Sequence, residues 1–481
     1  MKKESEQPEA LTAKKDKNFS EWYNQVIAIS GLIDKRYNVK GMFVWLNYGY
    51  ELILNLKNYW DQIFKETGLK ELYFPLIVPL EYAEMNDGWF KGFREQAFWV
   101  RGSDEKKATH ILRPTGEPAM YPMFALWTRA YTDLPLRIYE TVSSFRYETK
   151  HTRPLVRDRE ITVWFEIHTA HSTREEAEKE GGLHQKFYDL IWKKIAVPRI
   201  RVEKPEWECF PGAIGAVEDY TIMPNGKAME NGSINYLGQA YSKKFNIKFK
   251  DKDGKEKYAW QMCTGNGARF LVAALAAHGD DRGLVIPPEI AVIQLIIIPI
   301  YSTKDKSKVL KKANEIYDRL KKENIKVEID LREDRPGSKF YDWEIKGVPI
   351  RLEIGPKDLK NKSVMLVRRD NGKKESIKET QLVKKVDGLL EEIQRNIYKK
   401  ARKEFNDKIV FTNKLNEVNK LLDQGKVIKC FWDGEGKSYD KIKALGEGVD
   451  PFGVDIENKK QGRCIVSGKK TNKVLCISNT Y

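Results

Sequence analysis

The spacing of apolar residues changes near residue 286, and this change divides the chain into two parts. In the first part, one helix is predicted to begin near Ser20 and a second to cover residues 48–67, ending at Gly68. The apolar residues that fall on one face of the second helix are Ile53, Leu56, Trp60, Ile63 and Phe64. From there to about residue 285, short apolar strands alternate with turns, which predicts a mixed, largely antiparallel sheet.

Beyond residue 286, apolar strands alternate with helical stretches. The strands are expected at 292–300, 326–331, 349–355 and 363–369, with a helix at 304–323. This alternation predicts a compact α/β domain. A charged helix at about 379–405 then leads into a C-terminal module.

The pattern as a whole predicts an α+β protein in three domains, with boundaries at 18–285, 286–398 and 399–481. Residues 1–17 are charged and lack apolar periodicity, so we expect them to form a disordered tail.

The composition fits a folded protein that binds polyanions. The 481 residues are 41% apolar and 11% aromatic, which is enough for several cores. A formal charge of +16 attracts tRNA, DNA or anionic membranes. Lysine exposed on helix faces is the alternative explanation of this charge.

The sequence predicts a cytoplasmic protein. Its first residues contain no apolar run of the secretory type. The longest apolar run, 290–300, is interrupted by Gln294 and Pro299 and falls short of the ~20 residues of a membrane span. Five scattered cysteines do not suggest a disulfide framework.

Arginines and glutamates alternate with strand-type residues over 145–171. Arg146 and Arg157 stand eleven residues apart around an expected turn, where two guanidinium groups could grip a phosphate or a carboxylate from two sides. Cross-strand ion pairs are the alternative, and we favour them for Arg153 and Arg159.

Two further segments could bind charged groups. Gly265, Gly267 and Arg269 precede an apolar helix whose free N–H groups suit a triphosphate, although glycine-assisted packing explains the same pattern. Thr115 and Glu117 stand between apolar neighbours, where they could receive an amine or form a loop salt bridge.

Together with 68–75, these segments occur in the order of the three signature motifs of class II aminoacyl-tRNA synthetases, and the chain resembles the prolyl-tRNA synthetase family of the archaeal and eukaryotic type. The similarity covers about 18–400 and, more loosely, the C-terminal region including Tyr481. The segments that carry it are DKRYNVKG, LRPTGE, FRYETKHTRPL, EIHTAH, LGQAYSKKFNIKF, HGDDRGLVIPP and RPGSKFYDWEIKGVPIRLEIGPKD.

The resemblance implies an antiparallel class II catalytic domain, an α/β anticodon-binding domain, a small α+β C-terminal domain and a homodimer whose interface includes Pro75. It implies a proline–tRNA ligase that forms prolyl-adenylate from proline and MgATP and then charges tRNA. Only about 100 residues separate the second and third motifs, so no editing domain is expected.

The resemblance also implies roles for particular residues. Arg146 would bridge the substrate carboxylate and the α-phosphate, while Arg157 and Arg269 would hold the outer phosphates. The residues implied in ATP binding are Arg146, Glu148, Arg157, Ile161, Glu230, Ser233, Gly267 and Arg269.

The amino-acid pocket is implied to receive the amine of proline at Thr115 and Glu117. His168 belongs to its wall, although a core histidine with satisfied hydrogen bonds is the alternative. The residues implied in the pocket are Thr115, Glu117, Trp164, Glu166, His168, Phe210 and Asn235, and no metal ligand is expected there.

The chain departs from the family pattern near this site. Glu230, Ser233 and Asn235 stand where relatives usually have glutamine, threonine and histidine. Gly116 replaces a serine, and Gly267 replaces a hydroxyl residue. A carboxylate at Glu230 repels phosphate unless Mg²⁺ lies between them.

The C-terminal module departs as well. Relatives often hold zinc there with four cysteines, but Asp433 and Ser467 stand near two of those positions, and Cys430, Cys464 and Cys476 form no CxxC pair. The sequence therefore predicts no structural zinc.

Three functions remain open at this point: a proline–tRNA ligase, a paralogue that activates another amino acid, and a catalytically silent tRNA-binding protein. In the second domain, Arg351 and Glu353 point to one face of a strand. They could contact tRNA bases or form a surface ion pair.

Overall fold

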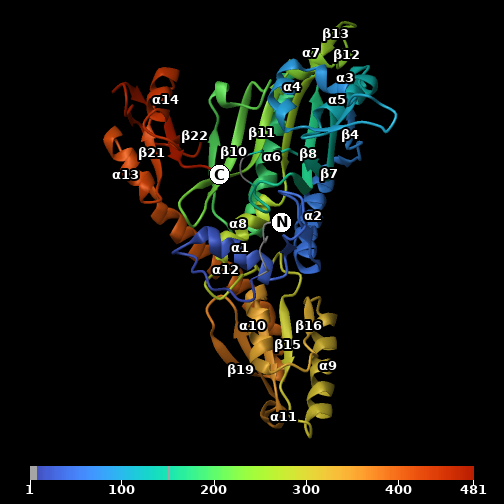
Figure 1. The fold of residues 1–481 in the computed structure, drawn as a ribbon, viewed down its shortest axis with the longest axis vertical. Coiled ribbons are helices and arrows are strands. Elements are labelled where there is room, and N and C mark those ends of the chain that lie inside the picture. The colour runs from blue at the N-terminus through green and yellow to red at the C-terminus, as the bar shows by residue number, and fades with distance from the viewer. Residues whose placement is uncertain (1–7, 150–151) are drawn as a thin grey trace.

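The computed structural model describes residues 8–149 and 152–481. Figure 1 shows a body built on a large central sheet, an α/β domain that extends from one end of it, and a C-terminal module at its flank. The long helix α12 (Leu382–Lys408) connects the last two parts. The first seven residues of the predicted tail lie outside the described residues.

The central sheet confirms the predicted antiparallel architecture. Six neighbouring strands pair antiparallel, and β3 (Lys70–Glu71) joins them parallel to β7 at the outer edge. In spatial order, the six strands are β9 (Ile200–Glu203), β10 (Gly215–Ile222), β11 (Ala228–Gly238), β14 (Trp260–Asn266), β8 (Glu160–His171) and β7 (Leu136–Phe145).

Amphipathic helices cover one face of this sheet. The predicted second helix is α2 (Asn47–Glu66), and all five residues of its expected apolar face are buried. Beside it, α6 (Arg174–Lys194) begins with a Thr173–Glu176 capping box and packs on β8, β11 and β14. The other helices of this layer are α1 (Phe19–Ile29) and α8 (Arg269–His278), and a small ribbon of β1 (Ile33–Asp34) and β2 (Val44–Trp45) adjoins them.

A second layer borders the opposite face. It contains a three-stranded sheet of β4 (Ile77–Pro79), β6 (His110–Leu112) and β5 (Phe98–Val100), and a hairpin of β12 (Lys248–Lys250) and β13 (Glu256–Tyr258). Its helices are α3 (Leu80–Glu84), α4 (Asp87–Phe93), α5 (Glu117–Trp127) and α7 (Ala240–Lys244).

The domain after residue 286 has the predicted α/β alternation. Three parallel strands and two antiparallel strands form one sheet, in the order β16 (Val327–Ile329), β15 (Leu295–Pro299), β17 (Ile350–Ile354), β18 (Ser363–Arg368) and β19 (Lys374–Lys378). Its helices are α9 (Lys306–Lys322), α10 (Pro336–Lys346) and α11 (Pro356–Asn361).

The C-terminal module extends the central sheet. Strand β22 (Asp450–Asp455) pairs with β9, with Val454 opposite Glu203, and so joins the two parts edge to edge. The sheet continues through β25 (Val474–Ser478), β21 (Val427–Phe431) and β20 (Ile409–Phe411). The remaining elements are α13 (Val418–Asp423), α14 (Gly436–Lys443), β23 (Gly462–Arg463) and β24 (Lys470–Thr471).

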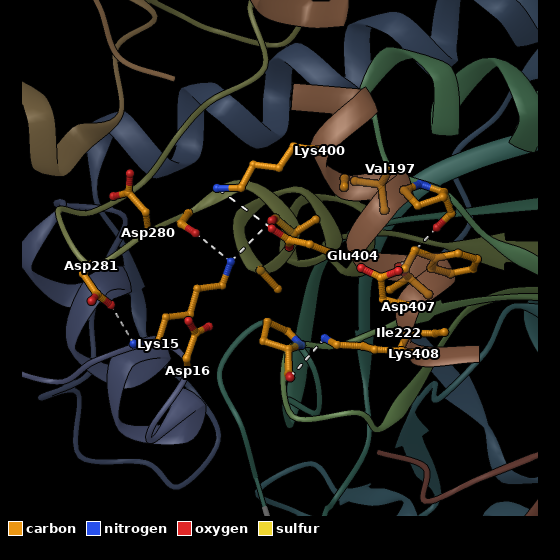
Figure 2. A pocket seen from close by; sticks show the side chains of 18 of the residues that line it. Lys15, Asp16, Val197, Ile222, Asp280, Asp281, Lys400, Glu404, Asp407 and Lys408 are labelled. Carbon is orange, nitrogen blue, oxygen red and sulfur yellow. Dashed lines mark hydrogen bonds and ion pairs between the residues drawn. The ribbon is translucent and has the colours of Figure 1, made fainter. Parts of the chain in front are cut away.

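Residues 8–17 differ from the predicted disordered tail, because they run across the end of α8. The Lys15 ammonium donates hydrogen bonds to the carbonyls of Ala277 (3.3 Å) and Gly279 (2.6 Å), which are left without helical partners at this terminus. Figure 2 shows this side chain in a cavity of about 600 Å³, with Lys400 and Glu404 of α12 close by. Burial lowers the pKa of Lys15 to about 8. The sequence did not predict these contacts, because the partners of Lys15 are backbone carbonyls, which any residue provides.

Among the helices of residues 8–149 and 152–481, none combines the length and the apolar character needed to cross a membrane.

Candidate active site

The candidate site lies on the face of the central sheet that α5 borders. Residues paired across neighbouring strands share a face, so the register places them in rows. One row runs Asn235, Cys263, His168 and Ile138. The next row runs Glu218, Ser233, Gly265, Glu166 and Glu140.

Most of the predicted site residues line one cavity of about 390 Å³ above these rows. Five predicted residues do not line it. The residues that line the cavity are Thr115, Glu117, Arg146, Trp164, Glu166, His168, Phe210, Glu230, Ser233 and Asn235. The others are Glu148, Arg157, Ile161, Gly267 and Arg269.

Thr115 and Glu117 are held in place at the start of α5. The Trp89 indole donates a hydrogen bond to the Thr115 hydroxyl (3.1 Å), and this hydroxyl donates to the Glu117 carboxylate. Both side chains are buried, and burial raises the pKa of Glu117. Among residues 8–149 and 152–481, the Glu117 carboxylate has this hydroxyl contact and no salt bridge.

His168 combines a structural hydrogen bond with a place in the cavity wall. The Tyr121 hydroxyl lies 2.9 Å from Nδ1 and fixes the imidazole ring. Burial lowers the pKa of His168 to about 3, so the ring is neutral at physiological pH. Its neighbour Glu166 shows the opposite shift, because burial and the nearby Glu117 raise its pKa to about 8.

A buried ion pair beneath this wall was missed by sequence reasoning. Arg113 and Glu140 are fully buried and approach to 2.5 Å, and the other carboxylate oxygen of Glu140 accepts a hydrogen bond from the Phe74 amide (3.1 Å). Arg113 lies within the quoted LRPTGE segment, where a charged residue between apolar positions was the available signal. No feature of the neighbouring sequence indicated that Glu140 is the partner of Arg113.

Arg146 lines the cavity, where several contacts hold its side chain. Its Nε donates to the carbonyl of Pro114 (3.3 Å), and its guanidinium lies over the rings of Trp164 (5.5 Å) and Phe93 (5.7 Å). These contacts position a planar cation at the cavity, where it can bind a carboxylate or a phosphate.

At the start of α8, Arg269 pairs with Glu230, which lines the cavity. Its Nη1 contacts both the carboxylate and the backbone carbonyl of Glu230, the latter at 3.0 Å, and its Nε donates to Val156 (3.0 Å). The carboxylate at position 230 is therefore neutralised by the same arginine that was expected to hold phosphate. Any phosphate that binds Arg269 competes with this contact.

Arg157 is exposed and reaches Tyr481 of the C-terminal module. Its Nη2 donates to the Tyr481 carbonyl (3.4 Å). The Tyr481 hydroxyl lies 2.8 Å from both Arg153 Nη1 and Asn225 Nδ2, and the Arg153 guanidinium lies 4.9 Å from the ring centre. The C-terminal module thus supports the loop that carries Arg157.

The predicted cross-strand ion pairs of Arg153 and Arg159 are wrong for the part of the chain that the structure describes. Arg153 binds Tyr481 and Ser20 instead. Arg159 donates to the carbonyl of Glu148 and covers the Tyr147 ring at 4.0 Å. Backbone carbonyls and aromatic faces take the place of carboxylates because both arginines lie in a turn.

A bulge in β8 orients the predicted adenine-side residue. The register shifts between Ser144–Ile161 and Val142–Trp164, which brings Ile161 to the same side as Trp164. Val163, within the bulge, has a positive φ of 56°, a strained backbone for a β-branched residue. A Cβ on Gly267 would lie 2.7 Å from the Val163 carbonyl, so Gly267 permits this close approach.

The remaining polar residues of the floor contact one another. Ser233 donates to the Asn235 side-chain oxygen (2.7 Å), and the Asn235 amide faces the Cys263 sulfur (3.7 Å). Glu117, His168 and Cys263 bring a carboxylate, an imidazole and a thiol within 4.8 Å of one another. Burial raises the pKa of the Cys263 thiol, so it is protonated in the free protein.

Comparisons with known proteins cover nearly the whole chain. The family model "tRNA synthetase class II core domain (G, H, P, S and T)" matches residues 98–278, and the "Anticodon binding domain" model matches 294–389. A proline–tRNA ligase of Pyrococcus abyssi is 39% identical over 472 residues, which cover 96% of this chain and 98% of that one. The chain belongs to the proline–tRNA ligase family.

Other members of the proline–tRNA ligase family show the same extent of similarity. The Methanobrevibacter smithii enzyme is 39% identical over 471 residues, covering 96% of this chain and 99% of that one. The structure of Giardia lamblia prolyl-tRNA synthetase in complex with prolyl-adenylate superposes with a TM-score of 0.94 at 30% identity, over 98% of this chain and all of that one.

Two other predicted features can be located in the structure. In the anticodon-binding domain, Arg351 and Glu353 form an ion pair at 2.9 Å, the second of the two interpretations considered. In the C-terminal module, the Asp433 carboxylate accepts hydrogen bonds from the hydroxyls of Ser438 (2.9 Å) and Ser467 (2.6 Å). The Ser467 amide faces the Cys464 sulfur (3.5 Å).

Proposed function

We propose that this chain is a proline–tRNA ligase. The observation that carries the proposal is the convergence of Thr115, Glu117 and Arg146 on one cavity, in a chain that matches proline–tRNA ligases along nearly its whole length. The hydroxyl of Thr115 and the carboxyl of Glu117 suit an amine, and the guanidinium of Arg146 in the same cavity suits a carboxylate.

The reaction follows from this arrangement in two steps. Thr115 and Glu117 receive the ring nitrogen of proline, while Arg146 aligns its carboxylate with the α-phosphate of MgATP. The carboxylate oxygen attacks the α-phosphorus, the bond to the β-phosphate oxygen breaks, and pyrophosphate leaves. A ribose hydroxyl at the end of tRNA then attacks the acyl carbon, and AMP leaves.

The protein supplies positioning and positive charge, and it needs no nucleophile of its own. Arg269 and Arg157 bind the outer phosphates, and Mg²⁺ arrives with ATP and neutralises part of their charge. Glu148 and Ile161 border the adenine ring, and Ser233 and Gly267 line the neighbouring surface. Glu166, His168 and Asn235 form the wall of the proline pocket, with Trp164 and Phe210 beside its apolar part.

Activation of a different amino acid is the second candidate. Three replacements near the cavity favour it: Gly116, Glu230 and Asn235. The Glu230 contact with Arg269 changes the nucleotide side, while Gly116 and Asn235 change the amino-acid side. Each change is of the kind that alters substrate preference through a pocket hydrogen bond.

ATP–pyrophosphate exchange measured with each amino acid separates the candidates. We expect exchange that depends on proline, followed by charging of tRNA with a proline anticodon. Exchange with another amino acid alone would support the second candidate. Binding of tRNA without exchange for any amino acid or proline analogue would support the silent tRNA-binding protein and refute both enzymes.

We also propose that the enzyme is a homodimer. Support comes from apolar side chains exposed around the short edge strand β3 and the start of β4, beside Pro75. The most exposed of these are Tyr73, Ile77, Leu126 and Trp127. Light scattering after size-exclusion chromatography should give twice the chain mass, and Ile77→Asp should shift it toward the monomer. A monomeric wild-type protein at assay concentration would refute the dimer.

The domain boundaries 18–285, 286–398 and 399–481, a cytoplasmic location and a C-terminal module without zinc belong to the same proposal. The hydrogen bonds of Asp433 with Ser438 and Ser467 offer a substitute for a metal cross-link. Elemental analysis of the purified protein should find less than one zinc per chain, and tightly bound stoichiometric zinc would contradict this.

A further inference from the structure

The loop between β9 and β10, residues 204–214, forms part of the wall of the amino-acid cavity. Three consecutive residues of this loop, Glu208, Cys209 and Phe210, line the cavity. The backbone hydrogen bonds in its middle are local, since the amide of Cys209 donates to the Glu206 carbonyl (3.3 Å). Local bonds shape a loop but do not attach it to the rest of the protein, so its side chains must fix its position.

One side of the loop packs on the catalytic domain. The Phe210 ring stacks on Tyr241 of α7, with ring centres 6.4 Å apart and an angle of 16° between the planes. The Phe93 ring lies 5.9 Å from Phe210. The Tyr241 hydroxyl donates a hydrogen bond to the Pro211 carbonyl (2.6 Å). These contacts support the loop from Phe210 onward.

The other side of the loop packs on the C-terminal module. The Trp207 ring lies nearly perpendicular to the buried rings of Tyr439 (5.6 Å) and Trp432 (6.3 Å), an edge-to-face arrangement that aromatic pairs favour. The next residue, Glu208, accepts a hydrogen bond from the Lys443 ammonium of α14 (2.9 Å). Trp207 is still 54% exposed, so the chain keeps a large apolar side chain at the surface where it reaches the module.

The loop therefore has two supports, one in each domain, and the cavity wall lies between them. Only three residue steps lead from Trp207 to Phe210, a length of at most about 11 Å. Glu208 and Cys209, which line the cavity, fall within this span. Because the span is so short, release of the loop at Trp207 would displace the wall itself.

We propose that Trp207 is a positioning residue for proline. By packing on the C-terminal module, it holds the 204–214 loop in place, so that Glu208 and Phe210 complete the wall of the amino-acid cavity. The inference rests on the proposed function, with proline as the ligand of this cavity. None of the described residues of 399–481 lines the cavity, so the module acts on proline binding through the loop.

The first test is ATP–pyrophosphate exchange at varied proline and at varied ATP. In Trp207→Ala, the loop occupies its bound position in a smaller fraction of molecules, and the apparent affinity falls by that fraction. We expect KM for proline to rise by about five- to tenfold, while kcat and KM for ATP stay within about twofold. Trp207→Phe keeps an aromatic edge against the module and should restore most of the affinity.

Three results would overturn the positioning role. The first is a wild-type KM for proline in Trp207→Ala. The second is an equal rise in KM for proline and for ATP, which would indicate a general loss of structure. The third is normal exchange with slower charging of tRNA, which would place Trp207 in a contact with tRNA.

The module side of the contact offers a matched pair of variants. Lys443→Met removes the ion pair with Glu208 and should raise KM for proline by about twofold, since the pair is partly exposed. Lys441→Met removes the same charge from an exposed side chain of α14 that has no ion pair among the described residues, and it should match wild type. Equal rises in the two variants would contradict the part assigned to Glu208.

Hydrogen exchange of the free protein tests the support without any substrate. In Trp207→Ala, the amides of 204–214 should exchange faster, while those of β10 and β11 keep their wild-type protection. Unchanged protection of 204–214 would overturn the support by the module. A wild-type protein that fails to exchange pyrophosphate with proline would refute the proposed function alone, because the hydrogen-exchange result does not depend on it.

Discussion

The proposed active site has an amino-acid side and a nucleotide side, and they differ in which contacts their side chains already make in the free protein. On the amino-acid side, Thr115, Glu117 and His168 are buried, and hydrogen bonds that involve Trp89 and Tyr121 hold them in place. On the nucleotide side, Arg269 binds Glu230 and Arg157 reaches Tyr481.

This difference separates a rigid recognition site from one that must exchange its contacts. Proline-sized ligands enter a cavity whose walls are already in place, so little ordering opposes binding. In the proposed reaction, ATP would replace the contact of Arg269 with Glu230 by phosphate contacts, and the strength of the lost contact would reduce the apparent affinity for ATP.

Arg146→Ala should have the largest effect, since Arg146 lies between the two halves. We expect kcat/KM for pyrophosphate exchange to fall by about 10²–10³-fold, because the charge developing at the α-phosphate loses its nearest fixed cation. Arg174→Ala, at an exposed arginine of α6, serves as the control and should retain wild-type exchange. A loss of less than about threefold in Arg146→Ala would contradict the assigned role.

Glu230→Gln should affect the nucleotide side alone. Removing the negative charge frees Arg269 for phosphate, so KM for ATP should fall by about tenfold while KM for the amino acid is unchanged. The difference from wild type should shrink at high ionic strength, since the pair is partly exposed. A rise in KM for ATP would mean instead that Glu230 acts through Mg²⁺.

Tyr481→Phe should have a smaller effect on the same side. The hydroxyl contacts with Arg153 and Asn225 are lost while the ring remains beneath Arg153, so KM for ATP should rise by about two- to fivefold. Tyr398→Phe removes a hydroxyl from an exposed side chain of α12 and should change nothing. Equal kinetics for Tyr481→Phe and wild type would show that this support does not reach the ATP site.

The smallest expected effect is on the stability of the fold, and it comes from Glu166 in the cavity. The pKa of Glu166 is raised to about 8, so the folded state holds its proton between the ordinary carboxyl pKa and 8, where the unfolded chain has lost it. Stability therefore falls as pH rises through this range. Glu166→Gln should melt a few degrees above wild type at pH 8.5, by roughly 2–6 °C, and the gain should vanish near pH 4.5. A gain that is constant with pH would exclude titration of Glu166 as its cause.

Some of this architecture could be predicted because its signals are local. The apolar face of α2, the alternation of the second domain and the motif residues of the cavity each follow from a short stretch of sequence. Arg113 with Glu140, and Arg269 with Glu230, could not be paired in this way, because the two members of each pair lie far apart in the sequence and meet only in the folded chain.

The contacts of residues 8–17 and the bulge at Val163 could not be predicted either, because both depend on the backbone rather than on particular side chains. Lys15 binds backbone carbonyls, which carry no sequence mark, and the bulge depends on a one-residue shift between β7 and β8. The close approach of Gly116 to Glu166 and of Gly265 to Trp164 is likewise visible only in the three-dimensional packing.

The pairing of β22 with β9 has a consequence for how the chain is made. Val202 leaves the ribosome long before its partner Asp455, and at 5–20 residues per second the interval is on the order of 10–50 s. During that time one edge of the catalytic sheet has unpaired backbone groups that other nascent chains can join. Slower translation between the two strands should therefore increase aggregation of newly synthesised protein, even where the finished fold is equally stable.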